Sequence, residues 1–247
     1  MKISPDVPKE ATAQPSRASV WKMFDRIAHR YDLLNRLLSF GQDVIWRKKV
    51  ARHLPQSPDL HILDVATGTG DLLISLYRES PRVTSGVGID MAEKMLAIGE
   101  EKLARRKLDS SLALQKGDAM NIPFTDKTFD AASIAFGIRN VEDVERALRE
   151  MYRVLKPGGR ALILEFSLPG NRVIRRLYLF YFRHLLPRIG GIISGDSYAY
   201  RYLNQTVETF PYGEDFCHLM RKAGFREVHY QPLTLGIATI YRGDRVE

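Results

Sequence analysis

Short apolar runs alternate along the chain with segments in which apolar residues recur every three or four positions. The runs have the length of buried strands, and the segments between them have the period of amphipathic helices. The runs lie at Ile62–Ala66, Val83–Ile89, Leu112–Lys116, Phe129–Ala135 and Ala161–Phe166. The helical segments begin at Leu72 and extend over Ala92–Arg106 and Val141–Leu155. This alternation predicts an α/β fold with a mostly parallel sheet, covered on both faces, whose ligands bind at the carboxyl ends of the strands.

The pattern changes at both ends of this region. Prolines among polar residues predict a disordered leader over residues 1–17. Further helices are expected from Val20, around Trp46–His53 and over Tyr212–Ala223, a turn at Lys156–Gly159, and final strands at Glu227–Pro232 and Leu235–Tyr241. We predict a single domain over residues 18–247, with a helical cap at 18–55 and an insertion at 167–211.

The turn after the first strand has the composition of a nucleotide site. Ala66, Gly68 and Gly70 form a run of small residues between the strand and the helix that begins near Leu72. Glycine lets the backbone approach a ligand closely, and the first turn of a helix presents unpaired N–H groups. The next strand ends at Asp90, where a carboxylate can accept hydrogen bonds from both hydroxyls of a ribose.

The spacing of the small residues distinguishes between two kinds of nucleotide. A dinucleotide fold has Gly-x-Gly-x-x-Gly, but Leu73 stands at the position of the third glycine. With Asp64 before it, the run resembles the acidic-x-Gly-x-Gly-x-Gly loop of S-adenosylmethionine-dependent methyltransferases, with Ala66 in place of the first glycine. The alternative is a turn of small residues that binds no ligand.

Composition and charge limit the cellular compartment and the kinds of partner to expect. The chain has 247 residues, of which 45% are hydrophobic, enough for a sizeable core. Cys217 is the only cysteine, no secretory leader is recognisable, and no apolar stretch approaches the roughly 20 residues that span a bilayer, so we expect a cytoplasmic protein. The net charge of +8 favours an anionic partner, either nucleic acid or a membrane surface. We expect no metal site, because no His or Cys has the spacing of metal ligands.

Several separate segments, in one order, together resemble the ubiquinone/menaquinone biosynthesis C-methyltransferase family from Val20 to Gly243. Those that resemble this family specifically are Tyr31–Asn35, Phe136–Asn140, Glu165–Ser167, His184–Gly190 and Tyr200–Leu203. Those that resemble the general motif series of class I methyltransferases are Asp64–Asp71, Asp90, Gly117–Phe124, Thr125–Asp130 and Leu155–Gly159. The resemblance implies a class I S-adenosylmethionine-dependent methyltransferase: a Rossmann-like, seven-stranded, mostly parallel sheet that ends in an edge hairpin. Helical segments before the first strand and after the fifth would cover the substrate.

The same resemblance implies C-methylation of a polyprenylated quinol, with S-adenosylmethionine as the methyl donor. For this reaction we predict catalytic roles for Arg139, Asn140, Tyr31 and His184. Arg139 would stabilise the ionised quinol, and His184 is either the base or a residue of helix packing. The resemblance assigns cofactor binding to Asp64, Ala66, Gly68, Thr69, Gly70, Asp90, Met91, Asp118, Ala119 and Ala135. Two positions depart from the family pattern, since Ala135 stands where Ser is usual and Asp118 where Asn is common.

An amphipathic, cationic helix is expected after the fifth strand. Between Phe166 and Gly195 there is no acidic residue, and the arginines gather within an arc of about 100° on a helix. These arginines are Arg172, Arg175, Arg176 and Arg183. The helix either lies against anionic lipid and covers an apolar substrate, or is a surface helix with a solvated basic face.

Three functions therefore compete. The first is quinol methylation, with the enzyme peripheral on the inner face of the cytoplasmic membrane and a homodimer or a quinone-biosynthesis complex as further partners. The second is a methyltransferase-like fold that only binds a nucleotide or a partner. The third is a methyltransferase for another small molecule or for RNA, suggested by the pI of about 9.6. No nucleic acid partner is expected, because the basic segment carries no base-reading module.

Overall fold

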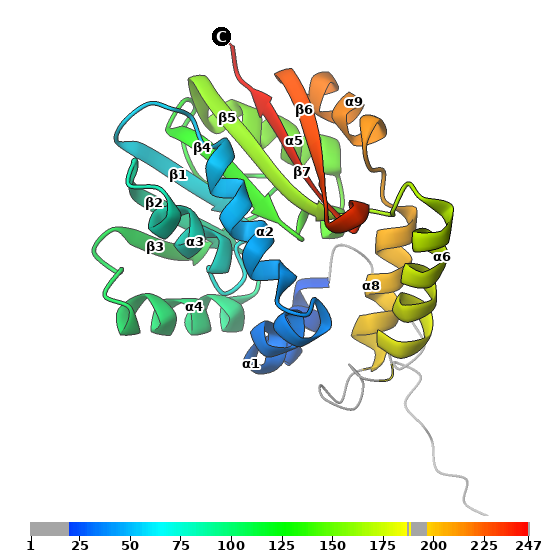
Figure 1. Cartoon of the computed structure of the whole chain (residues 1–247). Helices are drawn as coiled ribbons and strands as arrows, with labels where there is room; N and C mark the ends of the chain where they lie inside the picture. The colour runs from blue at the N-terminus through cyan, green and yellow to red at the C-terminus, as the bar shows by residue number, and fades with distance from the viewer. Residues whose placement is uncertain (1–19, 187, 189–196, 247) are drawn as a thin grey trace, which may run out of the picture.

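The computed structural model describes residues 20–186, 188 and 197–246, so the predicted leader lies outside the described residues. One seven-stranded sheet has the order β3-β2-β1-β4-β5-β7-β6 (Figure 1). The strands are β1 Leu60–Val65, β2 Val83–Asp90, β3 Leu112–Lys116, β4 Phe129–Ala135, β5 Leu155–Phe166, β6 Arg226–Leu233 and β7 Ala238–Asp244. The first five pair in parallel, and β7 runs antiparallel to both β5 and β6. The predicted fold class and the edge hairpin are confirmed.

Helices cover both faces of the sheet. They are α1 Val20–Leu38, α2 Gln42–Val50, α3 Asp71–Glu79, α4 Glu93–Arg105, α5 Val144–Val154, α6 Arg172–Phe180, α8 Ser197–Thr209 and α9 Glu214–Lys222. Apolar side chains of α2, α3 and α4 pack on one face, and those of α5 and α9 pack on the other. The order reverses between β1 and β4, so their carboxyl ends diverge into a crevice that can hold a ligand.

Two predicted boundaries were wrong. Residues 234–236 form a short 3-10 turn in which Leu235 has a φ of 59°, so the last strand begins at Ala238. The Lys156–Gly159 turn is not a break before the fifth strand but an irregularity within it. Phe129 pairs with Leu155 and Ala131 with Arg160, so the residues between Leu155 and Arg160 bulge out of the ladder.

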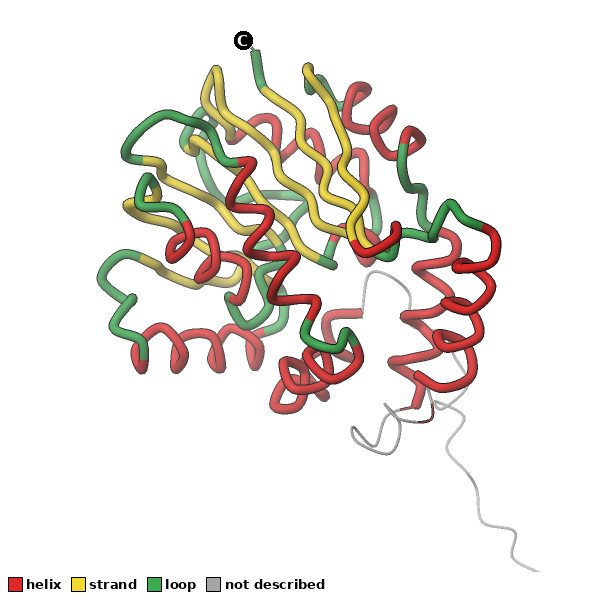
Figure 2. The backbone as a smooth tube through the Cα atoms, viewed as in Figure 1, coloured by secondary structure: helices red, strands yellow, loops and turns green. Residues whose placement is uncertain are grey.

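Helices α1, α6 and α8 lie beyond the carboxyl ends of the strands, and α2 runs from there across one face of the sheet (Figures 1 and 2). The α1 and α2 helices precede β1, whereas α6, a π-helical turn at Tyr181–Leu185 and α8 lie between β5 and α9. This insertion has its own small core, in which Phe182 and Leu186 pack against Leu168 and Val207. Asn204 Nδ2 donates to the Phe182 carbonyl at 2.7 Å, which joins α8 to the π-helical turn.

Candidate active site

The turn after β1 uses left-handed backbone conformations. Ala66, Gly68 and Gly70 have φ angles of 48°, 58° and 78°, a region that glycine adopts at little cost and alanine does not. Gly70 precedes the first residue of α3, Asp71, so the free N–H groups of that helix lie at the end of β1. A strained Ala66 thus stands where the resemblance leads one to expect glycine.

Asp64 holds this turn to the sheet. Its carboxylate accepts hydrogen bonds from the Thr67 hydroxyl at 2.6 Å and the Ser133 hydroxyl at 2.7 Å. Burial of the carboxyl raises its pKa to about 6, although both hydroxyl donors oppose that rise. Asp64 and Thr69 line a small hollow of about 30 Å³ beneath the turn, which Tyr31 and Arg47 also reach.

Asp90 joins the same turn to the start of α4. Its two carboxylate oxygens accept from the backbone N–H of Gly68 at 2.8 Å and of Ala92 at 2.9 Å. Burial raises the pKa of this carboxyl, and the backbone donors oppose the rise. The Asp90 side chain lies on the wall of a cavity of about 340 Å³, here called the loop cavity.

The loop cavity gathers most of the predicted cofactor residues. It is lined by Ala66, Gly68, Asp90, Met91, Asp118, Ala119 and Ala135, together with Asn140 and side chains of α1. Gly70 lines neither this cavity nor the small hollow, and its part is to allow α3 to begin. The predicted cofactor residues therefore converge around one site, with Asp64, Thr69 and Gly70 in supporting positions.

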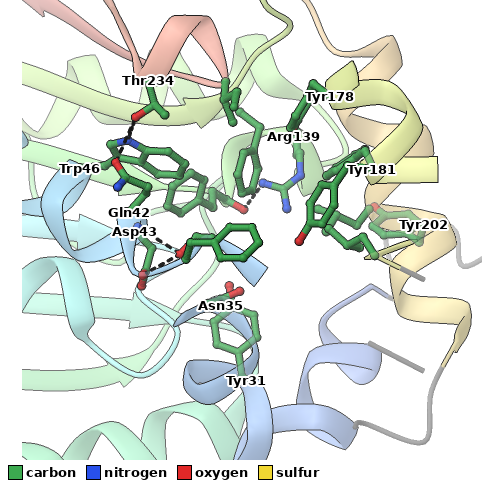
Figure 3. Close-up of a pocket in the computed structure, with 18 of the residues that line it drawn as sticks. Tyr31, Asn35, Gln42, Asp43, Trp46, Arg139, Tyr178, Tyr181, Tyr202 and Thr234 are labelled. Atoms are coloured by element: carbon green, nitrogen blue, oxygen red, sulfur yellow. Dashed lines mark hydrogen bonds between the residues drawn. The ribbon is translucent and has the colours of Figure 1, made fainter. Parts of the chain in front are cut away.

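A second, apolar cavity of about 290 Å³ lies beside the loop cavity (Figure 3). Its lining is mainly aromatic, and the rings of Trp46, Phe136 and Phe166 contact one another with centroids 4.5 to 6.3 Å apart. Trp46 is fixed by a hydrogen bond from its indole N–H to the Thr234 hydroxyl at 2.8 Å. Helices α1, α2, α6 and α8 and the π-helical turn supply most of the remaining wall, so the cap and the insertion enclose this space together.

Tyr31 lies where the cavities meet, since it lines the loop cavity, the apolar cavity and the small hollow. Burial raises the pKa of its phenol, so the hydroxyl stays protonated at neutral pH. The adjacent residues Arg139 and Asn140 line different cavities. Arg139 lines the apolar cavity, and Asn140 lines the loop cavity. The short helix Ile138–Asn140 at the end of β4 therefore brings three of the four predicted catalytic side chains together.

Arg139 is a buried cation with one buried counter-ion. Its Nη1 donates to Glu165 Oε1 at 2.6 Å and to the Phe136 carbonyl at 2.5 Å, and its guanidinium lies over the Phe166 ring. Burial raises the pKa of the Glu165 carboxyl, while the facing guanidinium favours the charged form. The arrangement holds a guanidinium beside its counter-ion in a mainly aromatic wall, which also carries Asp43 and Arg47.

The fourth predicted catalytic residue, His184, is not part of this junction. It is exposed and lines a surface hollow with arginines of α6, so its role as a base remains a prediction that the geometry does not favour. The predicted site also lacks four residues that the structure places at or around the cavities: Arg47, Lys102, Glu165 and Tyr178. Of these four, only Lys102 could have been recognised in the sequence, because it is a lysine on the apolar face of a predicted helix, together with Met95 and Gly99.

The loop cavity fits S-adenosylmethionine. Asp90 offers a carboxylate for a ribose, the turn offers N–H groups, and the volume is that of a small-ligand site. The Asn140 side-chain oxygen is buried and has no hydrogen-bond partner among the described residues, although it lies on the cavity wall. A bound polar ligand can supply that partner.

Solved structures show which fold this is. The fold is similar to that of an S-adenosylmethionine-dependent methyltransferase of Thermotoga maritima, with a TM-score of 0.64 and 22% identity over 92% of this chain and 99% of that one. A second such enzyme, from Aquifex aeolicus, matches with a TM-score of 0.57 and 19% identity over 81% and 89%. The chain therefore has the class I fold of S-adenosylmethionine-dependent methyltransferases.

Sequence comparison narrows the class to a family. Residues 11–245 match the model of the ubiE/COQ5 methyltransferase family, and the chain belongs to it. It is 48% identical to the ubiquinone/menaquinone biosynthesis C-methyltransferase UbiE of Geobacter sulfurreducens, over 90% of this chain and 87% of that protein. It is also 48% identical to the demethylmenaquinone methyltransferase of Thermus thermophilus, over 90% of this chain and all (100%) of that one.

Proposed function

We propose that this protein transfers a methyl group from S-adenosylmethionine to a ring carbon of a polyprenylated quinol in menaquinone or ubiquinone biosynthesis. The names of its relatives support this substrate class. The observation that carries the proposal is the apolar cavity beside the loop cavity, with a buried guanidinium in its wall. An aromatic ring with ionisable oxygens and an apolar tail fits such a lining.

Ionisation of the quinol is the step that the protein must assist. A ring carbon is a poor nucleophile until a neighbouring hydroxyl loses its proton and the oxygen donates charge into the ring. Arg139 does not act as a base, because a guanidinium remains protonated, but it stabilises the quinolate from the cavity wall or polarises a water that takes the proton. The aromatic lining keeps bulk water away, which strengthens this interaction.

Positioning is the second task. When bound, S-adenosylmethionine supplies an electrophilic methyl group. Asp90 and the Ala66–Gly70 turn would hold it in the loop cavity, with Asp118 and Ala119 near the adenine. Tyr31, which borders both cavities, would cover the point of transfer, and Asn140 would orient the reacting groups. Such alignment alone can contribute up to about 7–11 kcal/mol.

The redox state of the substrate provides the sharpest test. Purified protein with methyl-labelled S-adenosylmethionine should label a reduced demethylated naphthoquinol or benzoquinol, and the ratio of kcat/KM values would tell the two pathways apart. The oxidised quinone should accept no label, because it has no hydroxyl to ionise. Label in total RNA and none in either quinol would refute the proposal in favour of an RNA methyltransferase.

We further infer that the enzyme works at the cytoplasmic face of the membrane. No helix among the described residues is long and apolar enough to cross a bilayer. The α6 helix instead leaves Val173, Leu177 and Phe180 at 69%, 66% and 59% exposure, next to exposed arginines. Exposed apolar and cationic side chains on one helix favour binding to anionic lipid. A prenyl tail reaching the apolar cavity from the bilayer would then stay out of water.

A further inference from the structure

The wall of the apolar cavity carries a second buried polar group besides Arg139. Tyr178 of α6 lines the cavity, and Figure 3 shows its side chain beside Arg139. The Tyr178 hydroxyl oxygen is buried and has no hydrogen-bond partner among the residues that the structure describes. A buried hydroxyl without a partner lowers stability, and such groups are uncommon in folded proteins.

The surroundings of Tyr178 hold the hydroxyl in place and keep it a donor. Its ring stacks on Phe182, with centroids 5.1 Å apart, and Phe182 is itself buried in the small core of the insertion. Burial raises the pKa of the Tyr178 phenol, so the proton stays on the oxygen at neutral pH. A fixed, protonated and unsatisfied donor therefore lies near a fixed cation in an apolar space.

We propose that the Tyr178 hydroxyl donates a hydrogen bond to the ring oxygen of the quinol that Arg139 stabilises. The substrate oxygen would lie between a phenol and a guanidinium, and the developing negative charge would strengthen both interactions. This inference rests on the proposed function and deepens it, because it names the second group that recognises the ionised ring. This role could not be predicted from the sequence, since Tyr178 is one of several aromatic residues in a helix with apolar spacing.

The test is Tyr178→Phe in the full-length protein, assayed with reduced quinol and saturating S-adenosylmethionine. We expect kcat to fall about 10²-fold, by analogy with the loss of one donor to an oxyanion. The apparent pKa of the pH–rate profile should move upward, because the quinolate has lost a stabilising donor. Cofactor affinity should not change, and the melting temperature should stay equal or rise because an unsatisfied hydroxyl has been removed.

Tyr230→Phe serves as the matched control, since Tyr230 is 44% exposed on β6 and lines neither cavity. Its kcat and pH profile should equal those of the wild type. If the wild-type protein methylates the quinol and Tyr178→Phe has the same kcat and pH profile, this inference is overturned but the proposed function stands. A lower melting temperature together with lost cofactor binding in Tyr178→Phe would also overturn the inference, because Tyr178 would then support the fold and not the substrate. No quinol turnover by the wild-type protein would refute the proposed function and this inference with it.

Discussion

Replacing Arg139 by Leu removes one of the two arginines in the described lining of the apolar cavity and leaves Glu165 buried without its partner. Loss of a group that stabilises developing charge should lower kcat by about 10²–10³-fold. The unpaired carboxylate should also lower the free energy of unfolding by about 3–5 kcal/mol. Steady-state kinetics with reduced quinol, together with urea unfolding, would measure both effects.

A double variant separates the catalytic effect from the structural one. Arg139→Leu combined with Glu165→Gln removes both charges of this pair, so most of the lost stability should return. Turnover should remain low, because the guanidinium is still absent. Recovery of kcat along with stability would mean that Arg139 only supports the fold.

The raised pKa of Asp64 predicts a pH dependence of cofactor binding. Its pKa of about 6 in the free protein lies above the ordinary 3.8, so folding favours the protonated carboxyl. This contribution, up to about 3 kcal/mol, is present below pH 3.8 and is lost as the pH rises through about 6. A cofactor ammonium group that binds above the small hollow beside Asp64 would favour the ionised carboxylate instead. Affinity should therefore rise about tenfold between pH 5 and 7, as measured by calorimetry.

Asp64→Asn tests the origin of that change. An amide does not ionise near pH 6, so the variant should bind more weakly at pH 7 and show a flat dependence on pH. A wild-type affinity that is constant from pH 5 to 7 would contradict the link between Asp64 and the ammonium group.

Residues at strand ends were predictable from the sequence, but those on the cover segments were less so. Asp90 and Asp118 follow recognisable strands, and the chain brings such ends to one edge of a parallel sheet. Tyr178 reaches the cavity only because the insertion folds back over the sheet, which no local pattern encodes. His184 lies one or two turns further along the same segment and points elsewhere, so proximity in sequence was misleading there.

One lysine joins α1, α3 and α4 to the turn after β1. Lys102 Nζ lies 2.5 Å from Asp32, 2.8 Å from Asp71 and 2.7 Å from the Thr69 hydroxyl. Lys102→Met should loosen α1, speed hydrogen exchange of its amides and weaken cofactor binding. The loss of stability should be below the roughly 3–5 kcal/mol of a fully buried pair, because Asp32 and Asp71 keep some exposure.

Lys116→Met is the matched control. Lys116 pairs with Glu93 at 2.6 Å, but both side chains are more than half exposed, so the change in stability should be within about 0.5 kcal/mol. Exchange in α1 that is the same in both variants would show that Lys102 does not hold the cap.

The helices and strands themselves could be predicted from the spacing of apolar residues. Some of their ends could not, because they depend on contacts between distant segments. Gly158 and Gly159 have the sequence of a turn, yet they belong to β5, and their backbone groups exchange hydrogen bonds with Arg245, the residue after the last strand. The last strand begins late because Thr234 and Leu235 adopt left-handed backbone angles beside α2. Neither effect is visible in a short window of sequence.

At the scale of the whole molecule, the helices that line the apolar cavity include α6, which also carries the exposed apolar and basic side chains. Phe40, 79% exposed at the end of α1, has its ring 6.1 Å from that of Tyr181, which follows α6 and lines the cavity. Arg183, expected to join the free basic face, instead pairs with Glu208 of α8. The lipid-binding charge is therefore expected to come mainly from Arg172, Arg175 and Arg176.

Binding to anionic vesicles tests this surface. Wild-type protein should co-sediment with vesicles that contain anionic lipid, and added salt should weaken binding because it screens the attraction. Replacing Arg172, Arg175 and Arg176 by Gln should release the protein, at about 1 kcal/mol per residue, while cofactor affinity is retained. Replacing Arg105, Arg106 and Lys107, at the end of α4, by Gln removes the same charge from another surface and should change little. If both triple variants are released equally, the net charge of the protein and not the α6 surface causes binding. If the wild-type protein binds neutral vesicles equally well, the arginines do not drive the interaction.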